Sequence, residues 1–407
     1  MAGALAELCV LDCSRVLAGP WAGQILADLG ADVIKVERPG TGDDTRHWGP
    51  PYLRDQTGKE TSEAAYFLCA NRGKRSLTVD FATVEGRDIV RRLAAQSDVF
   101  LENHSVGDLA RHGLDYESLR ALNPRLVYCS ITGFGQSGPH APRVGYDFAI
   151  QALGGLMSVT GERDDRPGGG PQKAGVAVAD VMAGLYAAIA VLAALVHRER
   201  SGVGQHIDLA LLDVQVATLA NVALNYLVSG AVPVRWGNAH ANIVPYQVLP
   251  TADRPIVLAV GNDEQYRKFC EVAGAPELAV DSRYASNDAR VRHRDALTRE
   301  LERVLAARSA AAWLEALEPA GVPCAPINDV AEVFDDPQVR HRGLRVEVPH
   351  PLAGTVPLVA NPIRLSAAPI EYDTPPPLLG QHTEEILRER LDFTPAAIAE
   401  LRRRGVV

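Results

Sequence analysis

Asp180 is the residue in this sequence whose surroundings most suggest chemistry. It stands between a glycine-bearing extended segment, 170–179, and an apolar run, Val181–Val196. Cationic residues at 197–200 and a glycine at 202 follow the run, which predicts a buried helix that ends there. We expect Asp180 at the N-cap or in the first turn of this helix. A carboxylate in that place serves either as a helix cap or as an ionised nucleophile, and the position alone favours the cap.

The composition indicates a soluble globular protein that is larger than one ordinary domain. The chain has 407 residues, of which 47% are hydrophobic and 22% charged. Its net charge of −9 argues against a nucleic-acid-binding surface. The six cysteines include no C-x-x-C pair, so neither a zinc site nor a disulfide framework is expected.

The sequence shows no targeting or membrane-spanning signal. The N-terminal residues lack the basic segment and apolar run of a signal peptide. The apolar run Val181–Val196 is shorter than the roughly 18 residues that indicate a membrane span. We therefore expect a cytoplasmic protein with no membrane contact, no nucleic-acid partner and no bound metal.

The first third of the chain alternates short apolar strands with helices. Leu8–Asp12 reads as a strand, Trp21–Leu29 as a helix closed by a glycine, and Ala31–Glu37 as a second strand. The same rhythm continues with predicted strands at Arg75–Asp80, Asp98–Glu102 and Leu126–Ile131 and predicted helices near Glu85–Ala95 and Tyr116–Asn123. This pattern predicts an α/β fold with a doubly wound, Rossmann-like parallel sheet.

The first strand–helix turn does not match a dinucleotide-binding fingerprint. Its sequence, Ala18–Gly23, departs from G-x-G-x-x-G, and the bulky Trp21 would hinder close approach of a pyrophosphate. Glu37 does end the second strand, where an NAD site places a ribose-binding carboxylate. The missing glycine disfavours NAD. The turn-rich passage Gly133–Phe148 belongs at the carboxyl edge of the sheet, where α/β proteins bind ligands.

The second half of the chain has a different rhythm. Gly204–Asp208 opens an apolar run to about Leu227, which we predict to be one long helix. Beyond it we expect a smaller α+β domain, in which a strand at Pro255–Val260 leads into a turn at Gly261–Asp263. Further predicted elements are helices at Glu264–Ala273, Arg290–Arg308 and Ala311–Ala320, strands at Val346–Val348 and Val356–Leu358, and a charged helix from Thr383.

Several ordered segments resemble the class III CoA-transferase family, which includes formyl-CoA:oxalate and carnitine CoA-transferases and the related α-methylacyl-CoA racemases. The resemblance covers nearly the whole chain. The matching segments are Val16–Pro20, Leu29–Gly40 with Gly42 and Asp43, Asn71–Ser76, Glu102 with Asn103, Gly133–Pro139, Val176–Gly184 and Gly380–Thr383.

The resemblance implies that Asp180 is a covalent nucleophile. In the family, an aspartate attacks an acyl-CoA thioester, and the mixed anhydride is opened by CoA to leave an aspartyl-CoA thioester. An acceptor acid then takes over the CoA by the same steps in reverse. The family therefore uses the CoA thioester as a substrate and needs no permanently bound cofactor. A helix N-terminus would help to keep Asp180 ionised in a dry pocket.

The resemblance gives Tyr146 and Gly261 different meanings: Tyr146 distinguishes transfer from racemisation, and Gly261 lies on a loop that covers the intermediate in the family. Tyr146 replaces the histidine of the racemases, and a phenol with a pKa of about 10 is a poor acid–base group at neutral pH. The resemblance thus favours transfer over racemisation and leaves Asp147 as a possible cap without a catalytic role. Gly261 falls on the family's mobile glycine loop, although here the loop is only Gly261–Asp263.

A phosphate-rich ligand such as CoA needs cations and backbone N–H groups. By family position, the predicted ligand-binding residues are Val16, Leu17, Arg38, Arg72, Gly73, Lys74, Asn103, His104, Ser105, Arg111 and Arg143. Leu17 stands where the oxalate enzyme has a glutamine, which suggests a larger acyl group, either a dicarboxylate or a branched acid. Arg143 then either pairs with a distal carboxylate or is a plain surface arginine.

The resemblance also implies an architecture, an interlocked homodimer in which each chain passes through a ring made by the other. We accordingly expect a large Rossmann-like CoA-binding domain from 1–205 and 335–407, a helical linker at 206–234 and a small α+β domain at 235–334. The expected partners are an acyl-CoA, a carboxylic acid and a second copy of the chain. An acyl-CoA racemase and a non-catalytic CoA-binding protein remain the alternative functions.

Overall fold

The computed structural model describes residues 3–407 and divides the chain into two compact units. Unit 1 runs to Gly154 and also contains Gly175–Thr218 and Pro337–Val407. Unit 2 contains Gly155–Ala174 and Leu219–Asp336. The predicted domains had boundaries at 205, 234 and 335. They differ from these units because the structure assigns 155–174 to unit 2 and 206–218 to unit 1.

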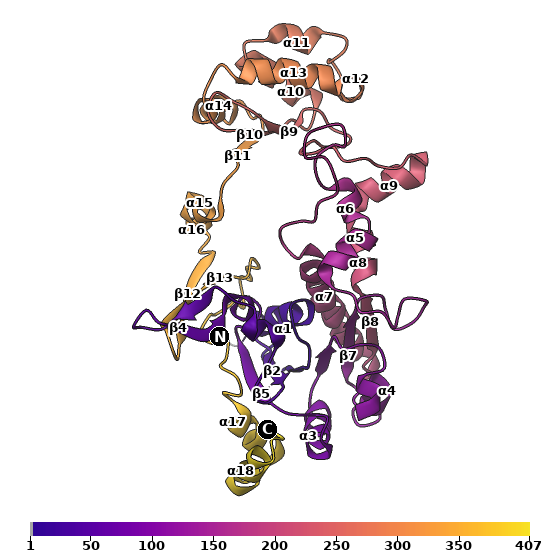
Figure 1. Ribbon diagram of the computed structural model, residues 1–407, viewed down its shortest axis with the longest axis vertical. Coiled ribbons are helices and arrows are strands. Elements are labelled where there is room, and N and C mark those ends of the chain that lie inside the picture. The colour runs from indigo at the N-terminus through magenta and orange to yellow at the C-terminus, as the bar shows by residue number, and fades with distance from the viewer. Residues whose placement is uncertain (1–2) are drawn as a thin grey trace. The chain divides into compact units, whose positions relative to one another are not determined.

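Unit 1 is built around a six-stranded sheet in which every neighbouring pair is parallel. The strands are β1 (Cys9–Asp12), β2 (Asp32–Glu37), β5 (Lys74–Thr78), β6 (Val99–Glu102), β7 (Val127–Thr132) and β8 (His206–Ala210). Their order is β5-β2-β1-β6-β7-β8, so the direction of winding reverses between β1 and β6. Figure 1 shows β5 and β2 on one side of the sheet and β7 and β8 on the other. The predicted α/β class with a parallel central sheet is confirmed.

Alternate residues of each strand point to opposite faces of the sheet and enter two separate cores. Leu11, Ile34 and Phe100 lie in one core, together with residues of α3 (Val84–Ala94), α17 (Thr383–Leu391) and α18 (Pro395–Arg403). Val10 and Val33 lie in the other, against α1 (Ala18–Asp28) and α7 (Val178–Ser201). Both faces of the sheet are therefore covered by helices, as a parallel sheet requires.

The predicted long helix from 204 to 227 is wrong. Residues His206–Ala210 form strand β8, in register with β7 from Tyr128 to Thr132. Gly204 allows the chain to enter this edge, because a Cβ there would lie 2.1 Å from the Leu126 carbonyl oxygen. Two short helices follow, α8 (Leu211–Thr218) and α9 (Ala220–Ser229). The apolar run could not reveal this, since pairing with a distant strand decided its conformation.

Helix α7 begins and ends close to the predicted limits and packs tightly on α1. Gly184 makes the close approach possible, because a Cβ there would lie 2.7 Å from the Ala18 carbonyl oxygen. Gly202 ends the helix in the left-handed conformation with a φ of 76°. By length and composition α7 could span a membrane, as could the bent pair α8–α9. Its Ala183, Ala187 and other small residues are instead buried in the core of unit 1.

The remaining elements of unit 1 are short. They include the antiparallel pairs β3–β4 and β12–β13, which are separate from the central sheet. Their bounds are η1 (Asp44–His47), β3 (Tyr52–Arg54), β4 (Glu60–Ala64), α2 (Ala65–Leu68), η2 (Leu109–His112), α4 (Tyr116–Arg120), α5 (Asp147–Leu153), α16 (Pro337–His341), β12 (Arg345–His350) and β13 (Gly354–Val359).

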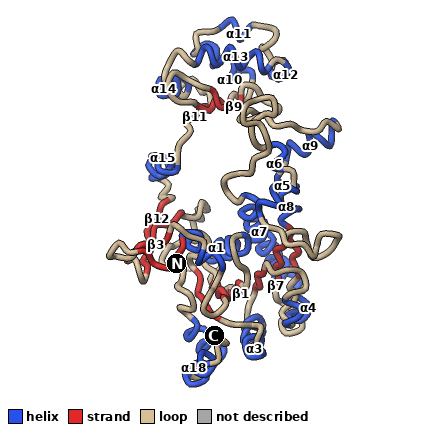
Figure 2. Tube along the Cα trace, viewed as in Figure 1, coloured by secondary structure: helices blue, strands red, loops and turns tan. Residues whose placement is uncertain are grey.

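Unit 2 has its own antiparallel sheet, whose strands are red in Figure 2. It also has its own core, in which Tyr266, Phe269 and Trp313 are almost completely buried. The sheet has the order β11-β10-β9, from strands β9 (Tyr246–Leu249), β10 (Ile256–Ala259) and β11 (Cys324–Pro326). Its helices are α6 (Leu156–Val159), α9, α10 (Asp263–Val272), α11 (Pro276–Val280), α12 (Asn287–Arg292), α13 (Arg294–Leu305), α14 (Ala310–Leu317) and α15 (Val330–Asp335). The predicted helix Arg290–Arg308 is thus two helices that meet at His293.

Candidate active site

A cavity opens in unit 1 where the winding of the sheet reverses, at the carboxyl ends of β1 and β6. Ligands of open α/β sheets bind at this kind of position. The cavity brings together eight of the predicted site residues, Val16, Leu17, Asn103, His104, Ser105, Arg143, Tyr146 and Asp180. Its other lining residues are Arg15, Ala18, Val106, Ile131, Thr132, Gly133, Ala141, Val144, Gly145 and Leu211. We call it the Asp180 cavity.

Asp180 lies in the first turn of α7, but it does not cap that helix. The Asp147 carboxylate, at the start of α5, accepts hydrogen bonds from the backbone N–H groups of Ala179 at 2.8 Å and Asp180 at 3.4 Å. Asp147 is therefore the cap that the sequence suggested as its possible role. Within residues 3–407, the Asp180 carboxylate has no hydrogen-bond or ion-pair partner, and it lines the cavity.

The surroundings of Asp180 make its carboxyl group unusually basic. The residue is only 9% exposed. Burial, followed by the nearby negative charge of Asp147, raises the pKa of Asp180 to about 7. Removal of a carboxylate from water disfavours its charged form, and a second carboxylate acts in the same direction. A buried, unpaired carboxylate with a raised pKa in a cavity is typical of a functional group rather than a structural one.

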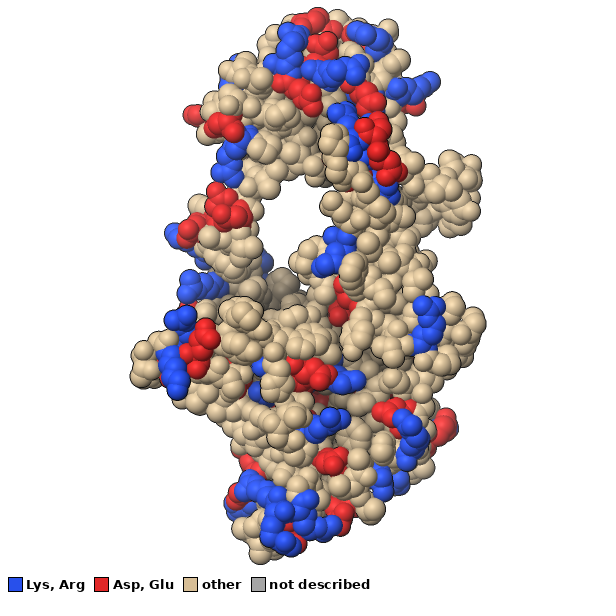
Figure 3. Space-filling model, viewed as in Figure 1, with Lys and Arg blue, Asp and Glu red and all other residues tan. Residues whose placement is uncertain are grey.

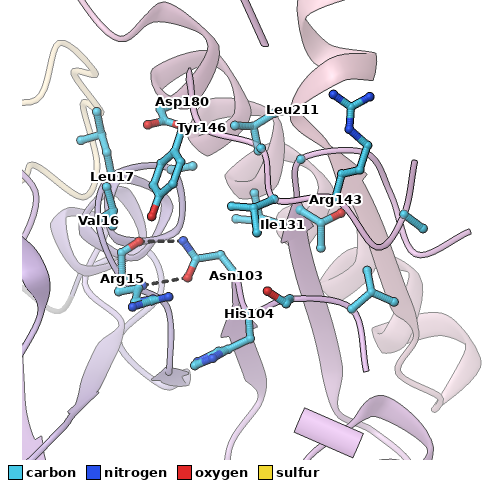
Figure 4. Close-up of a pocket in the computed structure, with 18 residues that line it drawn as sticks. Arg15, Val16, Leu17, Asn103, His104, Ile131, Arg143, Tyr146, Asp180 and Leu211 are labelled. Carbon is cyan, nitrogen blue, oxygen red and sulfur yellow. Dashed lines mark hydrogen bonds between the residues drawn. The ribbon is translucent and has the colours of Figure 1, made fainter. Parts of the chain in front are cut away.

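Asn103 joins the two loops that form the lower wall of the Asp180 cavity (Figure 4). Its side chain accepts the Arg15 N–H at 2.9 Å and donates to the Arg15 carbonyl oxygen at 2.6 Å. His104 contacts the Cys13 carbonyl oxygen through Nε2 at 3.1 Å, as a donor in the tautomer that carries the proton there. The loop after β6 thereby holds the loop after β1 in place.

Tyr146 and Arg143 enter the cavity from the loop that precedes α5. Tyr146 is the N-cap residue of α5 and is 59% exposed. Arg143 is exposed; its guanidinium lies 4.9 Å from the Phe134 ring centre and contacts Nδ1 of His140 at 3.3 Å. In the part of the chain that the structure describes, Arg143 has no carboxylate partner, whereas Arg15 pairs with Asp44 at 2.9 Å.

Known proteins match this chain over most of its length. The profile of CoA-transferase family III matches residues 5–383. The chain belongs to CoA-transferase family III. It is 52% identical over 385 residues to the succinate–glutarate CoA-transferase of Agrobacterium fabrum, covering 95% of each chain. It is 44% identical to the human succinyl-CoA:glutarate CoA-transferase, covering 98% of this chain and 88% of the relative. The family prediction is confirmed, and the protein is an enzyme of this CoA-transferase type.

Solved structures agree with the fold. A CAIB/BAIF family protein from Brucella suis is 51% identical, with a TM-score of 0.84 and coverage of 96% of this chain and 100% of that one. A hypothetical protein from Mycobacterium tuberculosis is 34% identical, with a TM-score of 0.82 and coverage of 94% and 99%. The whole chain therefore has the architecture of the family.

A second cavity of this CoA-transferase lies beside the Asp180 cavity in unit 1 and shares Arg15 and His104 with it. Arg38 lines this second cavity and is exposed there. Arg111 lines neither cavity; it lies on the exposed side of η2 and pairs with Asp108, which does line the second cavity. Arg38 thus faces an open space that a phosphate or its linker could enter, while Arg111 lies near its rim.

The side chains of Arg72 and Lys74, which were predicted with Gly73 to bind CoA, lie in the interior of unit 1. Arg72 is buried and pairs with Asp28 at 2.7 Å, and Lys74 is completely buried and pairs with Asp12 at 2.9 Å. Burial lowers the pKa of Lys74 to about 8. The Gly73 N–H donates to the Thr374 carbonyl oxygen at 3.0 Å. Basic residues at the start of a strand have the same sequence whether they face a ligand or the interior, so the sequence could not distinguish the two.

Gly261 belongs to unit 2, in the turn between β10 and α10. Its N–H donates to the Gln265 side-chain oxygen at 2.8 Å, and the residue is exposed. The following Asn262 caps α10 by accepting the N–H of Gln265 at 2.9 Å. These contacts describe an ordered turn at the start of a helix.

The structure also draws attention to two residues to which the sequence assigned no role. Lys35 and Asp43 are buried beneath the turn after β1, although both fell within the matching family segments. Their place in these segments could have singled them out, whereas their burial and the direction of their side chains come only from the fold.

Among residues 3–407, no group of three or more His, Cys, Asp and Glu side chains is placed to hold a metal ion.

The surface carries charges of both signs. On the face shown in Figure 3, Lys and Arg side chains alternate with Asp and Glu side chains over both units. Many of the exposed arginines form ion pairs, for example Arg120 with Glu117 and Arg403 with Glu400. This face therefore offers mixed charge rather than one extended basic surface.

Proposed function

We propose that this CoA-transferase moves CoA between dicarboxylic acids through a covalent thioester on Asp180. The observation that carries the proposal is the Asp180 carboxylate itself. It is buried, has no hydrogen-bond or ion-pair partner among residues 3–407, and lines a cavity where α/β proteins bind ligands. Because Asp147 serves as the cap of α7, the carboxylate of Asp180 is left available for attack.

The proposed reaction exchanges acyl groups without any other reagent. The Asp180 carboxylate attacks the thioester carbonyl of the donor, and the C–S bond breaks. CoA leaves as a thiolate, and the donor acyl group stays on Asp180 as a mixed anhydride. The thiolate then attacks the Asp180 carbonyl carbon, which releases the donor acid and leaves an aspartyl-CoA thioester. The acceptor carboxylate repeats the two steps in reverse order and leaves as its CoA thioester, while Asp180 returns to a carboxylate.

The N-terminus of α1 would stabilise the negative charge that moves through these steps. The start of α7 is less suited to this, because Asp147 already accepts the N–H groups of Ala179 and Asp180. The first turn of α1 has no side-chain cap, and Leu17 and Ala18 at its start line the same cavity. Free N–H groups and the positive end of a helix dipole favour anions such as a tetrahedral oxyanion.

The shape of the cavity supports a dicarboxylic substrate. Figure 4 shows Asp180 toward one end, Arg143 toward the other, and the apolar side chains of Ile131 and Leu211 between them. A C4 or C5 dicarboxylate has the matching order of a reacting carboxyl, methylene groups and a distal carboxylate. The two relatives described above are named for succinate and glutarate. We propose succinyl-CoA as donor and glutarate as acceptor.

Trapping of the covalent intermediate tests this function. The wild-type enzyme is mixed with succinyl-CoA and hydroxylamine, and the tryptic peptide that contains Asp180 is weighed. The proposal expects loss of activity together with a hydroxamate at Asp180, and no adduct in Asp180→Ala. A glutaryl-CoA product with no adduct at Asp180 would contradict the covalent route. Deuterium exchange at the α-carbon of an acyl-CoA would instead favour a racemase, which Tyr146 disfavours.

We also propose how the chain assembles, because α7 presents an exposed apolar face. Met182, Leu185 and Ile189 of α7 are exposed apolar residues in the single chain. A second copy that covers this face would form the core of the homodimer, which we propose to be interlocked, in the cytoplasm and free of membrane or nucleic-acid partners. We propose that the turn at Gly261 covers the covalent intermediate in this dimer.

A further inference from the structure

A buried ion pair lies directly beneath the turn that joins β1 to α1. Lys35, on β2, is completely buried, and its Nζ lies 2.9 Å from the Asp43 carboxylate, which is itself only 4% exposed. Burial alone would raise the pKa of Asp43. The Lys35 ammonium and hydrogen bonds from Thr45 outweigh burial and lower this pKa to about 2. Asp43 is therefore fully ionised at neutral pH.

Both members of this pair bind the backbone of the turn. The Lys35 ammonium donates to the Ser14 carbonyl oxygen at 3.0 Å. The Val16 N–H lies 3.2 Å from each of the two Asp43 carboxylate oxygens. Charged groups make the strongest hydrogen bonds to a backbone, and a buried site excludes competing water. The ion pair is thus a clamp on residues 14–16.

The clamped residue has a strained backbone. Val16 has a φ of 71°, in the left-handed region that β-branched residues rarely adopt. Strain of this kind persists only where surrounding contacts enforce it, and it gathers at functional sites. Val16 and the two residues after it line the Asp180 cavity, and α1 begins at Ala18. The backbone direction at Val16 therefore sets where the first N–H groups of α1 point.

We propose that Asp43 is a positioning residue for CoA transfer, because it holds Val16 in the left-handed conformation that aims the start of α1 at the reacting acyl group. The proposal rests on the function proposed for Asp180. It adds that the enzyme needs the negative charge of Asp43 for turnover rather than for binding of CoA.

A role in stability alone explains the Lys35–Asp43 ion pair less well than the positioning role does. Buried ion pairs contribute little net stability, because desolvation of the two charges offsets their attraction. The neighbouring buried Lys74 shows another use of such a charge: its hydrogen bonds go to Asp12, Pro20 and Asn71, and none goes to a residue with positive φ. Asp43, by contrast, accepts hydrogen bonds from the one residue of the turn that is strained.

A double-mutant cycle tests the positioning role. In Asp43→Asn, we expect the kcat of CoA transfer from succinyl-CoA to glutarate to fall tenfold or more, with the KM for succinyl-CoA changed less than threefold. Glycine adopts positive φ without strain. In the Val16→Gly background, the same Asp43→Asn substitution is therefore expected to lower kcat less than threefold. The penalty is judged against the Val16→Gly single variant, whatever the activity of that variant.

Thr45→Val is the matched control, because the Thr45 hydroxyl donates to the same carboxylate at 2.8 Å, whereas the Val16 N–H is bound by Asp43 itself. Its kcat should stay within threefold of wild type. Equal kcat penalties for Asp43→Asn in the two backgrounds, a lower melting temperature with unchanged kcat, or a change confined to KM would each overturn the proposal.

A measurement on the wild-type enzyme covers the case in which Asp43→Asn does not fold. Hydrogen exchange of the Val16 amide should be slow, as for an amide bound by a buried charge, and exchange as fast as in exposed loops would overturn the clamp. If no hydroxamate forms at Asp180 of the wild-type enzyme, that result would instead count against the proposed function. The steady-state kcat cycle measures the role of Asp43 whether or not that adduct forms.

Discussion

At the scale of single residues, Asp180 gains its proposed reactivity because its carboxylate is neither a helix cap nor a member of an ion pair among the described residues. The helix cap is supplied by Asp147, and among the described residues no cation pairs with the Asp180 carboxylate. Burial and the adjacent negative charge then raise the pKa of Asp180 to about 7. The carboxylate is a stronger base than an exposed aspartate, and it is available to an acyl group in the cavity.

The raised pKa predicts the pH dependence of turnover. Only ionised Asp180 attacks a thioester, so the kcat/KM for succinyl-CoA should rise about tenfold per pH unit below 7 and level off above it. In Asp147→Asn the cap is kept but its charge is lost, so the pKa of Asp180 falls and the rising limb moves to lower pH. A pH–rate profile from 5 to 9 measures both. An unchanged profile in the variant would show that another group controls the limb.

The same shift predicts an effect of Asp180 on stability. Its pKa is about 7 in the folded chain, against about 3.9 in an unfolded one. The folded state therefore binds the extra proton between these values, and stability decreases as pH rises from about 4 to about 7. We expect Asp180→Asn to be more stable than wild type at pH 8, by an amount on the order of 2–4 kcal/mol. Urea unfolding at pH 8 and at pH 4.5 measures this, and the difference should shrink to about 1 kcal/mol at pH 4.5, where the unfolded chain is still largely ionised at Asp180.

Arg143 is predicted to select the second carboxylate of the acceptor. A charge-assisted hydrogen bond contributes about 1.5–3 kcal/mol, which corresponds to a roughly 10- to 100-fold effect. Arg143→Gln should lower the kcat/KM for glutarate by that factor and change the value for pentanoate, which lacks the distal carboxylate, less than threefold. The exposed arginine Arg120 on α4 provides the control variant Arg120→Gln. Equal losses for the two acids would contradict this role.

At the scale of elements, the site depends on two helices that meet closely. α1 brings Leu17 and Ala18 to the cavity, α7 brings Asp180, and Gly184 lets the two helices touch. Helices come this close only where one of them has no side chain at the contact. The spacing between the nucleophile and the uncapped start of α1 is therefore set by a glycine one turn beyond Asp180.

Gly184→Ala is predicted to reduce both stability and activity. Its new Cβ would lie 2.7 Å from the Ala18 carbonyl oxygen, so α7 would have to move away from α1. Overpacking of this kind costs about 1–3 kcal/mol. Gly175→Ala is the matched control, because a Cβ there meets no atom within 4 Å. Thermal unfolding and kcat measure the outcome, and equal behaviour of the two variants would show that the helices separate without loss.

At the scale of the whole molecule, α7 has two apolar sides with different fates. One side is buried in the core of unit 1, and the other carries the exposed residues Met182, Leu185 and Ile189. Exposed apolar patches on soluble proteins mark interaction surfaces. If a second copy covers this side, as we propose, Ile189→Glu should weaken the dimer. Light scattering after size-exclusion chromatography measures the mass, and a wild-type monomer would contradict the proposed assembly.

Local pattern determined much of this protein. The alternation of short strands and helices up to Ile131 predicted the parallel sheet, and the apolar run after Asp180 predicted α7 with its glycine end. The ordered segments around them predicted the family, which the comparisons confirm. These features depend on residues close together in the chain, so a single sequence contains their signal.

Only the tertiary structure decided which way side chains face and what they meet. Pairing with β7 turned His206–Ala210 into a strand, although its apolar run predicted a helix. Packing turned the side chains of Arg72 and Lys74 inward and placed Asp43 against Val16. Contact between α5 and α7 gave the cap to Asp147 and left Asp180 free. Each outcome depends on residues distant in the chain, whose meeting no local pattern records.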